Sequence, residues 1–318
     1  MTRVLLSAPW TWAFGEPGPS APGVTFHLER RASDWGLPRW RARLRVLGDA
    51  LRIARGSAAS DCVVLSTVGA EAALLAAAAK LRSPRTRVLV FDFLAPRHQP
   101  PAVIARRLFG AVDRFLVIRT GDAAMLGRRF GVPRPRTEFL AWPVRVEGIA
   151  TAEDGYVYSA GWAHRDWDTL LAALEISGLP ATLAPGRGLQ VPASCADRVS
   201  VIDMPPPDAG RQLTARARVV AVAMRDTDLP SGPLVLLDAL AMGKAVVATA
   251  VNGTRDYVRD EESALVVPPG DPAALARALT RLWEDAELRR RLGEAARAET
   301  LSRCSLDRFW EDLAASCR

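Results

Sequence analysis

Short apolar runs rich in β-branched residues alternate with longer amphipathic runs along almost the whole chain. The run DCVVLST, for example, precedes GAEAALLAAAAKLR, which in turn precedes TRVLVFDFL. Apolar strands of about four to eight residues that alternate with helices of about ten or more predict a parallel sheet with helices on both faces. We therefore expect an α/β protein.

The alternation stops once and then restarts. The segment PVRVEGIATAEDG contains small and acidic residues and no long apolar run, which is typical of a linker. A chain of 318 residues also exceeds one ordinary domain. We therefore predict two doubly wound, Rossmann-like domains, residues 1–147 and 156–318, joined by a linker at residues 148–155. The second ends in a long helical tail, and ligands are expected at the carboxyl ends of the strands.

Charge is distributed unevenly between the two halves. Residues 1–150 hold 23 Lys+Arg and 11 Asp+Glu, residues 151–318 hold 19 and 24, and the sum is a net charge of +7. The basic half predicts an anionic partner, which can be a membrane face, a substrate or nucleic acid. Since no nucleic-acid-binding motif accompanies the charge, nucleic acid is not the expected partner.

Cysteines, histidines and apolar runs indicate the compartment. The four cysteines form no CxxC pair and the three histidines are far apart, so no structural zinc site is expected. This usage fits a reducing cytoplasm. No apolar run is long enough to cross a bilayer, and the N-terminal residues predict a first strand rather than a signal peptide. We expect a cytoplasmic protein, with a peripheral position at the inner membrane face as a further option.

One predicted helix, in DWGLPRWRARLRVLGDALRIARG, carries both leucines and arginines. At helical spacing Leu44, Leu47, Leu51 and Ala54 share one face, and Trp35 and Trp40 precede it. The arginines lie mainly on the other faces: Arg41, Arg45, Arg52 and Arg55. The leucine face can pack on the sheet of its own domain, or the helix can lie on an anionic membrane. Packing on the sheet is the preferred interpretation.

The stretch RDTDLPSGPLVLLDALAMGKAVVAT follows a strand-like run, RVVAVAM. Pro233 suits the first turn of a helix, and Ser231 or Gly232 suits its N-cap. The unpaired amides and the positive dipole end of such a helix form an anion site. Asp238 lies within the first turns of that helix, where it can reach a ribose or sugar hydroxyl. A strand–turn–helix with a solvated aspartate fits the same pattern.

The segment LLDALAMGKAVVATAVNGTRDYVRDEESALVVPPGDPAALARAL resembles the C-terminal core of family 4 glycosyltransferases, which have the GT-B fold. A second block, YVYSAGWAHRDWDTLLAAL, resembles the start of the C-terminal domain in that family, whereas the first hundred residues match only in layout. The resemblance implies retaining transfer of a sugar from a nucleotide-sugar donor, without a metal or another cofactor. It places the donor on the C-terminal domain and the acceptor, a glycan, a lipid-linked molecule or a secondary metabolite, on the N-terminal domain.

The resemblance also implies donor-binding residues. Arg165 aligns with the lysine that binds donor phosphate, Gly161 with a close approach to phosphate, and Asp238 with the acid that holds the ribose. Gly186 matches the glycine loop beside the nucleotide base. The expected donor-binding residues are Gly161, Arg165, Gly186, Asp228, Ser231, Gly232, Pro233, Leu234 and Asp238.

Two positions depart from the family pattern. The arginine that accompanies the phosphate-binding lysine aligns with Trp162, and the acid that contacts the donor sugar aligns with Pro230. The candidates to supply the missing positive charge are Arg225, Arg187 and His164. Asp228 is the candidate to replace the missing acid. These departures favour one alternative, a non-catalytic GT-B binding or scaffold protein. A nucleotide-sugar epimerase on the same fold is a second alternative, although the motifs favour a transferase.

Acidic residues outside the aligned positions have two further interpretations. The triplet Asp226-Thr227-Asp228 matches the metal-binding DxD pattern of the other major glycosyltransferase fold. We expect a solvated or sugar-facing loop instead, since a helix end and Arg165 already neutralise phosphate charge. The candidate catalytic residues are Asp92, at the end of a predicted strand, and His98, a few residues later. A surface position for His98 and a turn position for Asp92 remain alternatives.

Overall fold

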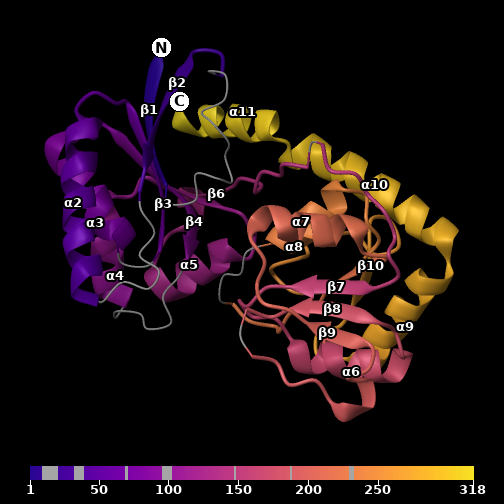
Figure 1. The fold of residues 1–318 in the computed structure, drawn as a ribbon. Helices are drawn as coiled ribbons and strands as arrows, with labels where there is room; N and C mark the ends of the chain where they lie inside the picture. Colours follow the sequence, from indigo (N-terminus) through magenta and orange to yellow (C-terminus); the bar gives the residue numbers. More distant parts are fainter. Residues whose placement is uncertain are drawn as a thin grey trace. The chain divides into compact units, whose positions relative to one another are not determined.

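The computed structural model describes residues 1–8, 21–31, 39–68, 71–94, 102–146, 148–186, 188–228 and 233–318. Their contacts divide the chain into two compact units, each with a six-stranded parallel sheet (Figure 1). Unit 1 comprises Met1–Pro143, Asp228–Pro230 and Leu306–Arg318, and unit 2 comprises Val144–Thr227 and Ser231–Ser305. The prediction of two α/β units with parallel sheets is thus confirmed.

The sheet of unit 1 has the strand order β2-β1-β3-β4-β5-β6, and each described pairing is parallel. The chain leaves β1 towards β2 on one side and continues from β3 on the other, so the order reverses between β1 and β3. The strands are β1 (Thr2–Ala8), β2 (Val24–Arg30), β3 (Cys62–Val68), β4 (Arg87–Leu94), β5 (Arg114–Val117) and β6 (Thr137–Phe139).

Helices cover this sheet, and an aromatic cluster lies in its core. The described helices of unit 1 are α2 (Arg39–Ser57), α3 (Glu71–Arg82), α4 (Ala102–Leu108), α5 (Asp122–Phe130) and α11 (Leu306–Cys317), with 3-10 turns η1 (Phe109–Ala111) and η2 (Arg134–Arg136). Phe93 and Phe109 pack with centroids 5.3 Å apart, and both meet Phe130 at 5.5 Å. Such tilted aromatic contacts stabilise the core beyond the area that they bury.

The leucine face of α2 does not pack on the sheet. The buried side of α2 contains Val46, Ala50 and Ile53, and α2 packs along α3 (Figure 1). Leu44 and Leu51 are instead 60 % and 62 % exposed. The preferred interpretation of this helix was therefore wrong about which face is buried. The helix has two apolar faces, and the helical period alone does not say which one meets the sheet.

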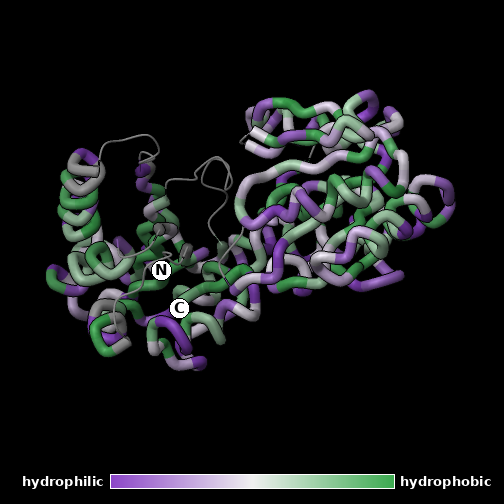
Figure 2. The backbone as a smooth tube through the Cα atoms, turned by 90° about the horizontal axis from the view of Figure 1, so that it is seen from below, coloured by the Kyte–Doolittle hydropathy of each residue, from purple (hydrophilic) through white to green (hydrophobic). Residues whose placement is uncertain are grey.

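The last helix, α11, belongs to unit 1, although the predicted second domain extended to residue 318. Its buried Phe309 lies 5.4 Å from Phe91 of β4, and its Trp310 lies 5.0 Å from Phe26 of β2, between ring centroids. The chain ends lie side by side in Figures 1 and 2, and the guanidinium of Arg318 donates to the carbonyl of Pro22 at 3.0 Å.

The sheet of unit 2 has the order β12-β11-β10-β7-β8-β9, again with parallel pairings. Its strands are β7 (Val157–Ala160), β8 (Ala181–Ala184), β9 (Val199–Val201), β10 (Val219–Val222), β11 (Val246–Thr249) and β12 (Leu265–Val267). Beginning at β7, the chain proceeds through β8 and β9 in one direction and through β10, β11 and β12 in the other. The order therefore reverses between β7 and β10.

Helices lie on both faces of the second sheet. They are α6 (Trp167–Ser177), α7 (Pro207–Arg216), α8 (Leu234–Ala241), α9 (Pro272–Glu284) and α10 (Ala286–Cys304), with the 3-10 turn η3 (Ala193–Cys195). Helices α6 and α9 pack together on one face, and α7 and α10 both contact α8 on the other (Figure 1). Aspartates cap three of them: Asp166 accepts from Thr169, Asp271 from Ala274, and Asp285 from Leu288.

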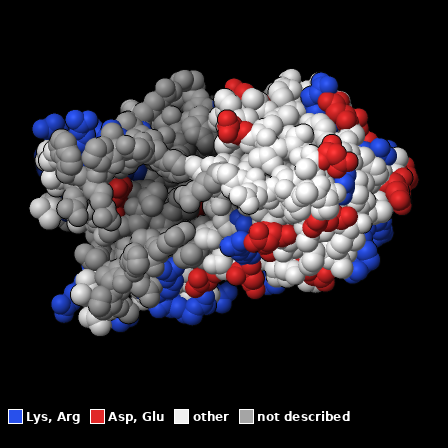
Figure 3. All heavy atoms as spheres, turned by 60° about the horizontal axis from the view of Figure 1, so that its bottom comes forward, with Lys and Arg blue, Asp and Glu red and all other residues white. Residues whose placement is uncertain are grey.

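The surface charge agrees with the uneven composition. On the face drawn in Figure 3, Lys and Arg gather at the outer edges of unit 1, whereas acidic and basic side chains are interspersed over unit 2. None of the helices in the described ranges combines the length and the apolar character that a bilayer span requires.

Candidate functional site

The loops after β7 and β10 run side by side at the carboxyl edge of the second sheet. The amide of Arg225 donates to the carbonyl of His164 at 2.9 Å, and the amide of Asp166 donates to the carbonyl of Ala223 at 3.0 Å. The backbones of Arg165 and Met224 pair as one antiparallel β-bridge. Because the strand order reverses between β7 and β10, this edge is the place where open α/β sheets bind their ligands.

Arg165 is a buried cation at this edge. Arg165 is only 7 % exposed, and its Nε donates to the carbonyl of Ala160 at 2.8 Å. No carboxylate among the described residues forms an ion pair with it, and burial lowers the pKa of the guanidinium to about 10. A buried charge without a counter-ion is costly, and an anionic ligand would offset that cost.

Gly161 makes room for this arginine. Its φ of +121° is a conformation that L residues with a side chain rarely adopt, and a Cβ there would lie 2.8 Å from Arg165 Nε. Its amide donates to the carbonyl of Ala184 at 3.0 Å, which joins the loop after β7 to the end of β8. The sequence predicted Gly161 for a close approach to phosphate, and the structure adds that only glycine leaves space for the guanidinium.

Trp162 occupies the position of the missing family arginine and covers the glycine loop after β8. A Cβ on Gly186, whose φ is +68°, would lie 3.3 Å from the Trp162 ring. The indole residue is 48 % exposed. Of the three candidates for the missing charge, Arg225 is exposed and forms an ion pair with Asp168 at 3.0 Å, and His164 is half-buried with a φ of +57°. Arg187 lies outside the described residues.

Asp238 lies on α8 and faces β7. Burial raises the pKa of its carboxyl to about 7, and the charge of Arg211 partly opposes that rise. The Asp238 carboxylate acts on Tyr158 of β7: burial raises the pKa of the Tyr158 phenol most, followed by Tyr156 and then Asp238. The Tyr158 hydroxyl is buried without a hydrogen-bond partner among the described residues. Sequence reasoning missed Tyr158 and Arg211, although strand alternation placed Tyr158 opposite Val157 and therefore towards α7 and α8.

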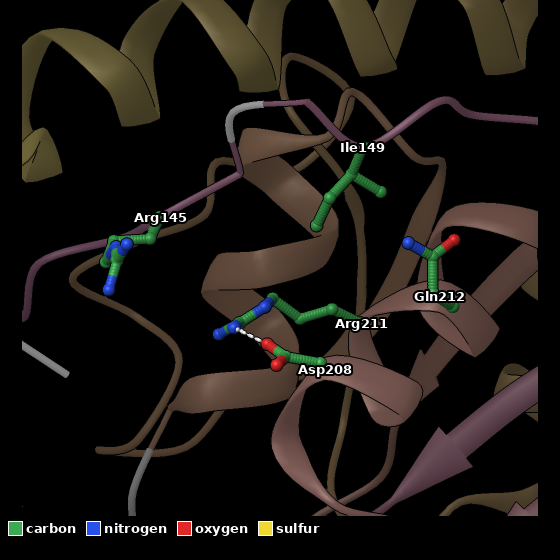
Figure 4. Close-up of a pocket in the computed structure, with 5 residues that line it drawn as sticks. All are labelled: Arg145, Ile149, Asp208, Arg211 and Gln212. Carbon is green, nitrogen blue, oxygen red and sulfur yellow. Dashed lines mark hydrogen bonds and ion pairs between the residues drawn. The ribbon is translucent and has the colours of Figure 1, made fainter. Parts of the chain in front are cut away.

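A polar pocket of about 320 Å³ lies within unit 2 beside α7. It is lined by Arg145, Ile149, Asp208, Arg211 and Gln212. In Figure 4, Arg211 points towards Asp208, with which it forms an ion pair, while Arg145 and Ile149 come from the segment before β7. Arg211, which lines the pocket, also lowers the pKa of Asp238 through its positive charge. The same guanidinium therefore acts on both the pocket and Asp238.

The start of α8 lies on the chain after β10. Pro233 is the N-cap residue, and its carbonyl accepts from the amide of Leu237 at 2.9 Å. Leu234 is the first helical residue, and amides of the first turn have no acceptor within their own helix. Ser231 and Gly232, the other two residues predicted for this turn, lie outside the described residues.

The acidic triplet is exposed. Asp228 groups with unit 1 by its contacts, and its Oδ2 lies 3.6 Å from Arg128 Nη2. The structure therefore does not group Asp228 with Arg165 and Asp238. Within the described ranges, no set of three or more His, Cys, Asp or Glu side chains is arranged to hold a metal ion.

In unit 1, a buried ionic cluster lies at the carboxyl ends of β4 and β5. Asp92 is 8 % exposed and has a φ of +47°. Its Oδ1 lies 3.6 Å from Arg119 Nη2 and has no hydrogen-bond partner among the described residues. Arg119 also pairs with Asp122 at 2.6 Å. Burial raises the pKa of Asp92 to about 6, Arg119 opposes the rise, and Asp122 adds to it. His98 lies outside the described residues.

Sequence and structure comparisons relate the chain to known proteins. Residues 195–299 match the family model for glycosyl transferases group 1. The D-inositol 3-phosphate glycosyltransferase of Salinispora arenicola is 33 % identical over 185 residues, which are 56 % of this chain and 40 % of that protein. The enzyme of the same name from Salinispora tropica is 35 % identical over 207 residues, 61 % of this chain and 41 % of that protein. The chain therefore spans about two fifths of the length of these curated relatives.

Solved structures match over the full chain. Anabaena Alr3699/HepE in complex with UDP and glucose superposes with a TM-score of 0.74 at 15 % identity and covers 99 % of both chains. The glycosyltransferase from Rickettsia africae ESF-5 superposes with a TM-score of 0.71 at 11 % identity, covering 99 % of this chain and 97 % of that one. These likenesses establish the fold, and they confirm the predicted GT-B architecture. The chain therefore has the GT-B fold, and its residues 195–299 match the family model for group 1 glycosyl transferases.

Proposed function

We propose that the chain is a glycosyltransferase that takes a sugar from a nucleoside diphosphate sugar. The observation that carries the proposal is Arg165, a buried cation that pairs with no carboxylate of the described residues and lies at the strand-order reversal of unit 2. A diphosphate has the charge to balance it, and the planar guanidinium can bind two phosphate oxygens at once. The match of residues 195–299 to group 1 glycosyl transferases supports the same conclusion.

In this proposal the donor lies along the carboxyl edge of the second sheet. Arg165 and the amide of Leu234 in the first turn of α8 face the diphosphate, and Gly161 allows its approach. Pro233 has no amide hydrogen, so it contributes only the helix start. Asp238 accepts hydrogen bonds from the ribose hydroxyls, and the base lies towards Gly186 and Trp162.

The proposed sugar transfer requires stabilisation of the negative charge that develops on the leaving diphosphate. Arg165 and the start of α8 supply that stabilisation, so the proposed transfer needs no metal ion. We further propose retention at the transferred carbon, with the leaving phosphate accepting the proton of the acceptor hydroxyl. Asp92 lies on the acceptor side, where its carboxylate, with a pKa of about 6, can orient that hydroxyl by accepting a hydrogen bond from it.

The acceptor is proposed to be a hydroxyl-bearing molecule bound by unit 1. The hydroxyls of Ser7 and Ser66, at the ends of β1 and β3, are buried without hydrogen-bond partners among the described residues, as is Asp92 Oδ1. Polar groups in this state suit a polyol such as a glycan or a glycosylated lipid. The curated relatives are named for D-inositol 3-phosphate, so inositol phosphates belong in the acceptor panel. A cytoplasmic location and contact with the inner membrane face also stay predictions.

The test is calorimetry of the full chain with UDP, GDP, ADP and TDP, followed by hydrolysis assays with the matching nucleotide sugars. We expect one diphosphate to bind and its sugar to be hydrolysed slowly without acceptor, in the presence of EDTA. Binding without hydrolysis or transfer would favour the non-catalytic alternative, and conversion of the sugar to its epimer would favour an epimerase. The absence of binding by all four diphosphates would refute each of these enzymatic assignments.

A further inference from the structure

The pocket beside α7 lies between that helix and the segment that precedes β7 (Figure 4). Arg145 and Ile149 come from the segment, and Asp208, Arg211 and Gln212 come from α7. Its volume of about 320 Å³ is in the range of pockets that hold small organic molecules. Among the residues that the structure describes, none of those expected to bind the donor lines this pocket. The proposed function therefore leaves it without a role.

The segment before β7 is fixed to unit 2 at both ends of the pocket. The amide of Val144 donates to the carbonyl of Cys304 at 2.8 Å, and the amide of Ala152 donates to the carbonyl of Ala215 on α7 at 3.0 Å. The ammonium of Lys244 donates to the carbonyl of Ala152 at 2.6 Å. Because unit 2 itself holds the walls in place, a ligand does not have to order them when it binds.

Two guanidiniums line the pocket, and neither is fully balanced. Arg145 is exposed and forms no ion pair or hydrogen bond with another described residue. Arg211 pairs with Asp208, whose side chain is 91 % exposed. Such exposed pairs contribute little free energy, so an anionic ligand can displace Asp208 from the guanidinium. Arg211 also acts on Asp238, but that carboxyl carries only part of its charge at neutral pH, because burial raises its pKa to about 7.

The described acidic residues of the segment pair elsewhere. Glu153 pairs with Arg289 at 2.9 Å, and Asp154 pairs with Arg216 on α7. Glu147 lies outside the described residues. The side chains that line the pocket in the described ranges thus carry two positive charges and one exposed negative charge. This balance favours an anion as the ligand.

We propose that this pocket binds a phosphate group, either inorganic phosphate or the phosphate of a small ester. A phosphate has acceptor oxygens in several directions, so guanidiniums from two different elements, Arg145 and Arg211, can bind it at once, whereas the two oxygens of a carboxylate lie in one plane. The Gln212 amide can donate a further hydrogen bond, and Ile149 offers an apolar contact to the organic part of an ester. The inference goes beyond sugar transfer and does not depend on it, because these residues are not the proposed donor residues.

The test is calorimetry of the full chain at low salt with inorganic phosphate, glucose 6-phosphate, glucose and glucuronate. The variant Arg145→Gln removes one guanidinium, and Asp208→Asn removes the carboxylate that competes for the other. The control Arg277→Gln changes an exposed arginine of α9 in the same unit. Each substitution is compared in the wild type and in Arg165→Ala, because phosphate can also bind at the proposed donor site. Circular dichroism checks that every variant is folded.

We expect phosphate to bind in both backgrounds, about tenfold more weakly with Arg145→Gln, more tightly with Asp208→Asn, and equally with Arg277→Gln. Tighter binding of glucose 6-phosphate than of inorganic phosphate would identify an ester as the ligand, and the reverse order would identify the free ion. Phosphate affinity that Arg145→Gln leaves unchanged in both backgrounds would overturn the proposal. So would the loss of all phosphate binding in Arg165→Ala alone, or binding of glucose or glucuronate as tight as that of glucose 6-phosphate.

Discussion

Replacing Asp238 by asparagine should stabilise the protein and weaken nucleotide binding at the same time. Burial on α8 raises the pKa of the carboxyl to about 7 from its ordinary value of 3.8, because the carboxylate loses water without gaining a full set of partners. At 1.36 kcal/mol per pH unit, ionising Asp238 in the folded chain costs at most about 4 kcal/mol. Asparagine has nearly the same shape and carries no charge, so the variant avoids this cost.

The sign follows from proton binding. Between pH 4 and pH 7 the folded wild type holds more protons at Asp238 than the unfolded chain, so its free energy of unfolding falls as the pH rises. Below pH 4 the carboxyl is neutral in both states, and the two proteins should be about equally stable. The advantage of Asp238→Asn should therefore grow from pH 4 to pH 7 and then level off at about 2–4 kcal/mol, since Asp238 keeps some contact with solvent.

Urea unfolding of both proteins at intervals from pH 4 to pH 8 measures this difference. Calorimetry with the bound nucleoside diphosphate should show the opposite effect on function, with about tenfold weaker binding by the variant above pH 7, since an amide oxygen accepts more weakly than a carboxylate. Wild-type affinity should rise with pH up to about 7 and then level off. A stability difference that stays constant across this pH range would refute the assignment of a raised pKa to Asp238.

Three further perturbations test other parts of the account. Gly161→Ala places a Cβ 2.8 Å from Arg165 Nε and should weaken diphosphate binding, whereas Gly155→Ala, with a similar positive φ but open space, should leave affinity unchanged in calorimetry. Asparagine tolerates the left-handed φ of Asp92, so Asp92→Asn should keep the fold. We expect the wild-type transfer rate to fall as the pH drops through about 6, and the variant to lack this fall. A variant whose pH–rate profile keeps the fall would exclude Asp92 from the transfer step. Phe309→Ala should lower the free energy of unfolding by about 3–5 kcal/mol in thermal scans, with nucleotide affinity unchanged below the transition; a changed affinity would contradict the placement of α11 in unit 1 alone.

The sheets and the donor loop were predictable from sequence because their signals are local. Alternation of apolar strands and helices predicts parallel sheets, and Gly161 and Arg165 after β7 were identified through the family resemblance of one short block. The resemblance added the expectation that Arg165 takes the place of a phosphate-binding lysine. The structure added the physical reason for Gly161, whose missing Cβ makes room for the guanidinium of Arg165.

The remaining features depend on contacts between residues that are distant in sequence. Helix α11 has a buried apolar face in either unit, and only tertiary packing on Phe91 and Phe26 assigns it to the first. Helix α2 presents two apolar sides, so the period could not distinguish the anchoring side from the exposed leucines. In the sequence Tyr158 is an ordinary strand residue. Its role depends on Asp238, which is 80 positions later in the chain and acts on the Tyr158 phenol only in the folded unit.

Calorimetry of Arg165→Ala tests the central claim most directly, with the nucleoside diphosphate that the wild type binds and with its parent nucleoside. The matched control is Arg277→Ala, an exposed arginine of α9 in the same unit. We predict a loss of about 10- to 100-fold in diphosphate affinity for Arg165→Ala, with nucleoside affinity unchanged, and no loss for Arg277→Ala. Equal diphosphate affinity in the wild type and Arg165→Ala would contradict the claim that this buried guanidinium binds the donor phosphates.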